Sequence, residues 1–366
     1  MITVKNTYNE AKIFTDAIDS ATEGLLSAFC ALPVSAGSKI RVMPDVHAGK
    51  GCVIGTTMTI TDKIATGLIG VDIGCGITAV RLEPKRIEMM KLDKLIHEKI
   101  PAGRVARSSA HRFADEIDLG ALLCGKHIQK DKAYASIGTL GGGNHFIELD
   151  KDENGAYWLV IHTGSRRLGA EVAAYYQEEA FRSSENTPYE LAYATGDLMA
   201  AYLHDLAITQ EFARLNRLAI ADEICKGMKL SAEARYECVH NYCDLDAMIL
   251  RKGAISAKEN EFVIIPMNMR DGCLIGKGKG NADWNFSAPH GAGRLMSRQE
   301  AKNSFTLSQY KKEMKGIYSS SVTKETLDES PMAYKPMEDI LSKIADTVEI
   351  TERILPVYNF KAGEER

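Results

Sequence analysis

Residues 70–76 read Gly70-Val71-Asp72-Ile73-Gly74-Cys75-Gly76, and this stretch decides how the rest of the chain is interpreted. Its glycines let the backbone turn tightly and approach other groups closely. The side chains of Asp72 and Cys75 can therefore converge on one point, such as a metal ion. One carboxylate and one thiol are too few ligands for a structural zinc site. The stretch predicts a metal site whose remaining ligands come from elsewhere in the chain.

The composition is that of a large globular protein without an overall basic field. The chain has 366 residues, of which 45% are hydrophobic, and a net charge of −4. Contact with nucleic acid would therefore have to come from a local patch. The first residues show no signal-peptide pattern, and no apolar run approaches the roughly 18 residues of a membrane span. With eight scattered cysteines, which indicate reduced thiols, we expect a cytoplasmic protein and no membrane association.

Strand and helix patterns are mixed along the chain without a regular alternation. Segments rich in Val, Ile and Thr predict strands, and apolar residues at helical spacing predict helices. The expected strands are 39–43, 52–60, 77–82, the end of 137–149, 157–161, 236–239, 248–255, 262–266 and 350–360. The expected helices are 87–100 and most of 167–225, and the glycine-punctuated segment 272–293 is expected to be a loop. This pattern favours an α+β fold in one integrated domain over residues 1–366.

The nine histidines fall into two groups. Four lie in charged or helical settings, where a solvated or capping role is the usual one: His97, His111, His127 and His204. The other five lie at a strand end or turn, where functional groups on rigid scaffolds collect: His47, His145, His162, His240 and His290. With Asp72 and Cys75 they could hold two divalent ions if the sulfur bridges them. Thiolate disfavours magnesium, and Mn, Zn, Co and Fe all remain open.

Several short motifs resemble, in family order, those of the RtcB family of RNA ligases. They are Met43 to His47, Val71 to Gly76, Gly141 to Glu148, His162 to Arg166, His240 to Tyr242, Arg251 to Ala254 and His290 to Arg294. The resemblance covers most of the chain. It implies a single RtcB-like domain with mixed and antiparallel sheets around a central metal-containing cleft, and a helical layer.

The resemblance also implies a reaction and a set of site residues. Two Mn²⁺ ions, with Zn²⁺ or Co²⁺ as possible substitutes, would be held by Asp72, Cys75, His145, His162 and His240, with Cys75 as the bridge. His290 would attack the α-phosphate of GTP and form a histidine–GMP adduct. Implied GTP contacts are Asn144, Phe146, Glu148, Asn268, Gly291, Ala292, Gly293 and Lys361. Implied RNA or phosphate contacts are Asp45, His47, Arg166, Lys252 and Arg294.

In such a reaction GMP passes to an RNA 3′-phosphate, generated from a 2′,3′-cyclic phosphate, and a 5′-hydroxyl end displaces it. The chain departs from commoner family members at Pro266-Met267-Asn268-Met269-Arg270-Asp271-Gly272, where they carry Pro-Gly-Ser-Met-Gly. It is also shorter than typical members and so resembles the smaller branches, including those encoded beside a release-factor homologue. RNA repair, of tRNA or ribosomal RNA, is the expected setting, and an archease-type activator is a possible partner.

Two other functions fit the same residues. One is a metal-dependent phosphodiesterase that opens RNA cyclic phosphates without a nucleotide. The other is a non-catalytic RNA-binding homologue, which the presence of every expected ligand and of the nucleophile disfavours.

Overall fold

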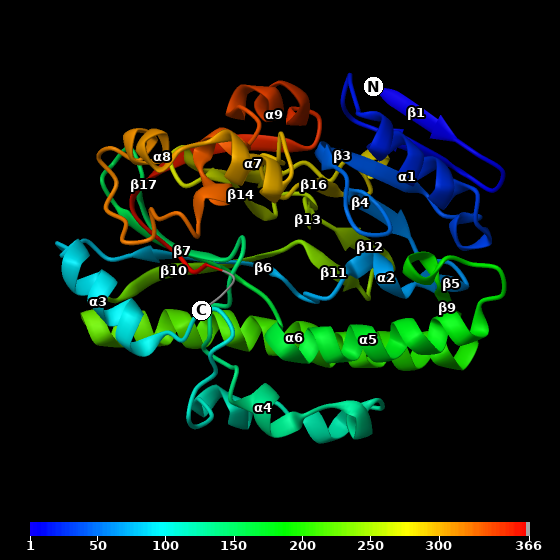
Figure 1. Cartoon of the computed structure of the whole chain (residues 1–366), viewed down its shortest axis with the longest axis horizontal. Helices are drawn as coiled ribbons and strands as arrows, with labels where there is room; N and C mark the ends of the chain where they lie inside the picture. The colour runs from blue at the N-terminus through cyan, green and yellow to red at the C-terminus, as the bar shows by residue number, and fades with distance from the viewer. Residues whose placement is uncertain (364–366) are drawn as a thin grey trace.

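The computed structural model describes residues 1–363. The predicted domain spans residues 1–366, so its last three residues lie outside the described residues. The chain forms two large β-sheets with helices packed around them (Figure 1). Most paired strands are antiparallel, and β2 pairs with β3 in parallel. The predicted α+β class, with mixed and antiparallel sheets, is therefore confirmed.

The smaller of the two sheets has the strand order β1-β2-β3-β4-β12-β11. Its strands are β1 (Ile2–Lys5), β2 (Glu10–Ile13), β3 (Ile40–His47), β4 (Ile54–Thr59), β11 (Asn241–Asp244) and β12 (Ile249–Lys252). Two further sheets have two strands each. One pairs β5 (Lys63–Ala65) with β9 (Tyr193–Thr195), and the other pairs β13 (Ala254–Ser256) with β16 (Ser287–Pro289).

The larger sheet has seven strands in the order β10-β6-β8-β7-β17-β15-β14. They are β6 (Gly76–Leu82), β7 (Phe146–Lys151), β8 (Tyr157–Thr163), β10 (Ala232–Val239), β14 (Phe262–Asn268), β15 (Gly272–Gly278) and β17 (Val348–Lys361). Strands from both halves of the chain meet in this sheet. The larger sheet therefore joins segments distant in sequence, and the organisation of residues 1–366 as one domain stays a prediction.

The helices of the described residues are α1 (Ser20–Cys30), α2 (Thr66–Ile69), α3 (Met89–Lys99), α4 (Lys130–Tyr134), α5 (Arg166–Ser183), α6 (Gly196–Met228), α7 (Arg298–Ser304), α8 (Leu307–Glu313) and α9 (Met337–Ile344). Figure 1 shows α5 and α6 side by side as a layer beneath the sheets. Ile220 and Ile224 of α6 share a buried cluster with Val80 of β6 and Ile161 of β8. The predicted helical layer thus covers one face of the larger sheet. None of the helices in residues 1–363 is long and apolar enough to cross a membrane.

The prediction of a loop over 272–293 is wrong for its first part, because Gly272–Gly278 forms strand β15 between β14 and β17. The glycines of this strand allow the backbones of neighbouring segments to come close to it. A Cβ at Gly276 would lie 2.4 Å from the Glu349 carbonyl oxygen, and one at Gly278 would lie 2.3 Å from that of Lys258. Glycine therefore lets strands pack where a side chain would clash.

Candidate metal and nucleotide site

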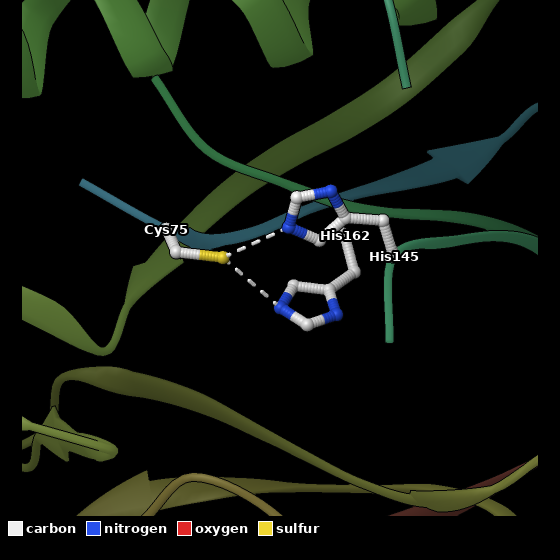
Figure 2. A group of neighbouring side chains, drawn as sticks. All are labelled: Cys75, His145 and His162. Atoms are coloured by element: carbon white, nitrogen blue, oxygen red, sulfur yellow. Dashed lines mark hydrogen bonds between the residues drawn. The ribbon is translucent and has the colours of Figure 1, made fainter. Parts of the chain in front are cut away.

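The five side chains predicted as metal ligands meet at the beginning of β6. Cys75 Sγ lies 3.5 Å from His145 Nε2 and 3.3 Å from His162 Nε2 (Figure 2). His145 Nε2 also lies 2.8 Å from Asp72 Oδ2. On the other side, His162 Nε2 lies 3.2 Å from His240 Nε2. The order in space is therefore Asp72, His145, Cys75, His162 and His240, with the sulfur in the middle.

The turn before β6, which carries two of these ligands, requires glycine at two positions. Gly74 has a φ of +73°, and a Cβ there would lie 2.7 Å from Ala213 Cβ on α6. A Cβ at Gly76 would lie 2.7 Å from the Cys238 carbonyl oxygen on the neighbouring strand. The turn can therefore press against both α6 and β10 only because these positions lack side chains.

Two fully buried polar side chains of α6 tie the surrounding loops together. Asn216 Oδ1 accepts the N–H of Gly138 at 2.8 Å, next to the glycine-rich turn before β7. Arg217 Nη1 donates to the carbonyl oxygens of Gly74 at 2.7 Å and Thr163 at 3.1 Å. The sequence shows both only as polar residues of a long helix, and their role becomes visible once α6 is placed under the turns.

Hydrogen bonds to backbone carbonyls fix how the histidine rings are protonated. His145 Nδ1 lies 2.9 Å from the Leu140 oxygen, and His162 Nδ1 lies 3.1 Å from the Asn144 oxygen. Because a carbonyl oxygen only accepts, each Nδ1 carries a proton, and each ring turns its Nε2 toward Cys75. His240 Nδ1 is buried and has no hydrogen-bond partner among the described residues.

This arrangement fits a metal centre because lone pairs of nitrogen, oxygen and sulfur atoms from five side chains converge on one small region. The Nε2 atoms of His145 and His162 and the thiol of Cys75 form one group whose ligand atoms lie within 4.8 Å of one another. The mixed nitrogen, oxygen and sulfur donors suit first-row transition ions such as zinc, cobalt or manganese. A cation would satisfy the facing lone pairs.

A histidine binds a metal through a neutral ring, and burial and neighbouring charges lower the pKa values of two histidines of the cluster in that direction. Burial holds the pKa values of His162 and His240 well below the ordinary value, so both rings are neutral. Burial would raise the pKa of Asp72, but the charge and hydrogen bond of His145 outweigh it and lower that pKa to about 2. Burial, together with Asp72, raises the pKa of the Cys75 thiol. A bound cation would be needed to hold this sulfur as a thiolate.

His290 lies beside this cluster, and Asp45 holds it. His290 Nδ1 is 2.7 Å from Asp45 Oδ2, which also accepts the His290 backbone N–H at 3.1 Å. The rings of His240 and His290 have centroids 5.0 Å apart. Asp45 is fully buried, so its carboxylate contacts His290 in this structure, and its contact with an RNA phosphate stays a prediction. The engaged Nδ1 leaves Nε2 of His290 as the free nitrogen.

A cavity of about 710 Å³ opens next to His162, His240 and His290. All eight residues expected to contact GTP line it: Asn144, Phe146, Glu148, Asn268, Gly291, Ala292, Gly293 and Lys361. These positions come from strands β7, β14 and β17, from the turn before β7 and from the loop after β16. Segments distant in sequence therefore build one wall of the cavity.

Two charged side chains at the cavity wall, Glu148 and Lys361, form hydrogen bonds with other residues of the protein. Glu148 accepts a hydrogen bond from the Asn359 amide. Lys361 Nζ donates to Glu329 at 2.5 Å and lies 5.6 Å from the centroid of the Phe146 ring. Burial raises the pKa of Glu148 to about 7, against the opposing charge of Lys361.

Asn268 occupies the segment in which the chain departs from the commoner motif. Its Oδ1 accepts the N–H groups of Arg270 and Asp271, each at 3.0 Å, and its amide donates to Asp271 Oδ2 at 2.8 Å. This is the self-contained turn typical of asparagine. Asn268 therefore lines the cavity while its amide group is already used in the β14–β15 turn.

The residues expected to contact RNA are not gathered in one place. His47 and Arg294 line the cavity. Arg294 donates to the Asp328 carbonyl oxygen at 2.8 Å, so its guanidinium is partly used. Arg166 donates to the Gly103 oxygen at 2.9 Å, and Lys252 is buried against the Lys50 oxygen at 3.2 Å. Of these four, two face the cavity and two support loops near it.

Lys335 was not expected from the sequence, yet it joins the two segments that carry His290 and Asp45. Its Nζ donates to the Val46 carbonyl oxygen at 2.9 Å, and its backbone N–H donates to the Gly293 oxygen at 3.0 Å. A lone lysine before Pro336 gives no sequence signal for such a role. It becomes recognisable only when β3 and the 290–293 loop are seen to pack together.

His111 belongs to the group of histidines expected to have a solvated or capping role. His111 Nδ1 accepts the Phe113 N–H at the beginning of a short 3₁₀ turn, which is a capping role. Cys238 and Cys243 are buried and lie outside the metal-like groups of the described residues. All eight cysteines are unpaired, in agreement with the expectation of reduced thiols.

Comparison with known proteins gives consistent matches along most of the chain. A family model described as "tRNA-splicing ligase RtcB" matches residues 26–127 and 123–362. The chain is 32% identical over 355 residues to "RNA-splicing ligase RtcB" of Escherichia coli strain K12, covering 85% of this chain and 87% of the relative. It is 29% identical over 407 residues to "tRNA-splicing ligase RtcB" of Aeropyrum pernix, covering 84% of each.

A further relative bears on the expected branch. The chain is 27% identical over 350 residues to "RNA-splicing ligase RtcB2" of Escherichia coli strain ATCC 25922, covering 87% of this chain and 86% of the relative. This identity is lower than that to the K12 protein. The comparisons thus leave placement in a shorter, RtcB2-like branch as a prediction.

Proposed function

The chain belongs to the RtcB family, and from that premise we propose that it is a GTP- and Mn-dependent RNA ligase acting through a histidine–GMP intermediate. It would join an RNA 3′-phosphate or 2′,3′-cyclic phosphate end to a 5′-hydroxyl end. The observation that carries this proposal is the position of His290. Its imidazole is held by Asp45 at 2.7 Å, beside the five-ligand cluster and at the wall of the 710 Å³ cavity.

The first step would be attack of His290 Nε2 on the α-phosphorus of GTP. The new bond is N–P, the bond that breaks joins the α-phosphorus to the bridging oxygen, and pyrophosphate leaves. With Nδ1–H held by Asp45, the lone pair of His290 sits on Nε2. As the ring acquires positive charge during attack, the adjacent carboxylate stabilises it.

Asp72, Cys75, His145, His162 and His240 would hold the metal ions. When bound, such ions offset phosphate charge and orient the reacting groups, which is the main contribution proteins make to phosphoryl-type transfer. Glu148 would accept N–H groups of the guanine base, and the Gly291–Gly293 backbone would hold phosphate. Lys361 would contribute a cation at the same wall.

In the second stage, an oxygen of the RNA 3′-phosphate attacks the phosphorus of the adduct, and the bond to His290 breaks. The 5′-hydroxyl of the joining strand then attacks the activated 3′-phosphate, and GMP leaves. A cyclic phosphate must first be opened by water to give the 3′-phosphate. The physiological RNA is proposed to be a cleaved tRNA or ribosomal RNA, and the location is proposed to be the cytoplasm.

The decisive experiment is incubation of the purified protein with GTP and Mn²⁺, followed by intact mass measurement. We expect a mass increase of one GMP, which is absent in His290→Ala. No adduct under Mn²⁺, Co²⁺ or Zn²⁺ would contradict the proposal. Release of a 3′-phosphate from cyclic-phosphate RNA without GTP and without joining would favour the phosphodiesterase, and RNA binding without turnover would favour a non-catalytic homologue.

A further inference from the structure

A second group of potential ligands lies beneath the cavity, apart from the five-ligand cluster. Glu148, Asp150 and Cys273 each offer one ligand atom, and these atoms all lie within 4.8 Å of one another. Their exposed fractions are 2%, 0% and 0%. We call these three residues the buried acid–thiol cluster.

Strand geometry explains why the three side chains meet. Glu148 and Asp150 are two residues apart on β7, so they point to the same face of the sheet. Cys273 lies on β15, and β17 runs between β7 and β15. The register of β17 against β7 shifts between Pro356, opposite Asp150, and Tyr358. This irregularity lies beside Asp150, where the two carboxylates and the thiol converge.

The cluster holds more acceptors than donors. Neither carboxylate oxygen of Asp150 has a nitrogen or oxygen donor among the described residues, and the group that interacts with it is the Cys273 thiol of the same cluster. Oδ1 of Asn359 is likewise buried without a hydrogen-bond partner among the described residues. The Asn359 amide already donates to Glu148. Lys361, whose charge acts on Glu148, directs its ammonium hydrogen bond to Glu329. A buried carboxylate without a nitrogen or oxygen donor is costly, so something absent from the protein's own side chains must compensate for it.

From this imbalance we propose that the buried acid–thiol cluster binds a divalent transition-metal ion of the zinc class, with Glu148, Asp150 and Cys273 as protein ligands. Zinc accepts carboxylate oxygen and thiolate sulfur in four-coordinate sites. Thiolate disfavours magnesium and calcium. This site goes beyond the ligase function and does not depend on it.

The ion would also connect the cluster to the cavity. Glu148 contributes to both, so a cation bound through one of its oxygens would fix the carboxylate in place and keep it ionised at the cavity wall. In the absence of a cation, the cluster must hold protons instead. Burial and the neighbouring Glu148 raise the pKa of Asp150, and burial and Asp150 raise that of Cys273.

The test uses Co²⁺ as the probe in full-length Cys75→Ser protein, in which the thiol of the five-ligand cluster is absent. A bound Co²⁺ with a cysteine ligand gives a thiolate-to-metal charge-transfer band in the near ultraviolet. We expect the Cys75→Ser protein to show this band and to lose it when Cys273→Ser is added. The matched control is Cys238→Ser, because Cys238 is a buried cysteine of the same apolar cluster as Cys273 and its removal should leave the band intact.

Metal content provides a second measurement that does not depend on the cobalt band. After dialysis against Zn²⁺ and then metal-free buffer, elemental analysis of Cys75→Ser protein should still detect bound zinc, and Asp150→Asn should reduce it. The proposal would be overturned if the folded Cys75→Ser protein showed neither the cobalt band nor retained zinc. The three side chains would then be held by protons and not by a metal ion. Because neither readout uses GTP or RNA, failure here is distinguishable from failure of the ligase proposal, and His290→Ala should leave both unchanged.

Discussion

The Nδ1 atom of His290 lies 2.7 Å from Oδ2 of Asp45, whose carboxylate is fully buried. This pair joins the loop after β16 to strand β3 and determines which ring nitrogen is available. A Cβ at Gly293 would lie 2.4 Å from the Asp45 carbonyl oxygen, so the close packing of these two segments depends on glycine at this position.

Asp45→Asn is expected to slow formation of the GMP adduct. An asparagine of the same size can offer its amide to Nδ1, which would then have to accept, and the proton would move to Nε2. We expect a decrease on the order of 10²–10⁴-fold, the range for loss of a positioned acid–base partner. Timed intact mass measurements with GTP and Mn²⁺ would check this. Metal content should not change, and an unaltered rate would contradict the orienting role.

Cys75→Ser is expected to reduce metal binding at the five-ligand cluster. The sulfur lies within 3.5 Å of both His145 Nε2 and His162 Nε2, so its loss affects both sides of the cluster. The loss in affinity should exceed the roughly 10–100-fold typical of removing an outer partner of a ligand. Competition with a chromophoric chelator would measure it. Cys238→Ser is the control, and equal affinities in the two variants would argue against a ligand role for Cys75.

Lys335→Met is expected to lower the rate of adduct formation by about 10²-fold, the cost of a small misplacement of reacting groups. Lys335 supports the two segments that carry Asp45 and His290 and does not contact the free nitrogen. The KM for GTP should therefore change less than kcat, and Lys335→Arg should restore part of the rate. Lys343→Met removes a lysine that pairs with exposed Asp16 and should have no effect. A change in KM alone would refute the positioning role.

Two buried glutamates near Lys361 should respond oppositely to conversion to glutamine in chelator-treated protein. Burial raises the pKa of Glu148 from 4.5 to about 7. Between these values the folded state holds a proton that the unfolded state has lost, so stability falls as pH rises through this window. Glu148→Gln should therefore be more stable than wild type at pH 8, and the gain should shrink toward pH 4.5.

Glu329 provides the contrast. Burial would raise its pKa, but the charges of Lys361 and Arg298 outweigh burial and lower it to about 2. Its contribution to stability is complete above pH 4.5 and is lost as pH falls toward 2. Glu329→Gln should be destabilised by about 3 kcal/mol at pH 8, because two cations lose a buried partner. Urea unfolding at pH 5 and pH 8 would measure both variants, and shifts of the same sign would contradict the account.

The sequence motifs predict a set of ligands whose side chains the structure brings together, but no local pattern predicts what supports them. His145, His162 and His240 stand next to strand ends, and a strand end is a local feature that composition reveals. The partnership of Lys335 with Val46 and Gly293 depends on how β3 packs against a loop almost 250 positions away, which no local pattern records. Asp150 and Cys273 escaped notice because each looks like an ordinary strand residue until β7 and β15 are placed on either side of β17.

The failure over 272–293 has a related physical cause. Glycine in this segment was interpreted as a sign of turns, but Gly276 and Gly278 leave room for neighbouring backbones that come from 349 and 257–258. A single sequence does not distinguish glycine that bends a chain from glycine that admits a neighbour. The role of Asn268 was likewise not visible in the sequence. Its side chain closes the turn between β14 and β15.

The position of β17 has a consequence for synthesis of the protein on the ribosome. This strand lies between β7 and β15 inside the larger sheet and carries Lys361 to the cavity wall. All five ligands of the first cluster and His290 precede it in the chain. A nascent chain could therefore gather its metal ligands while the sheet still has a gap where residues 348–361 belong. Such a chain would have neither the finished cavity wall nor Lys361, so the proposed GTP binding would have to wait until translation has passed β17.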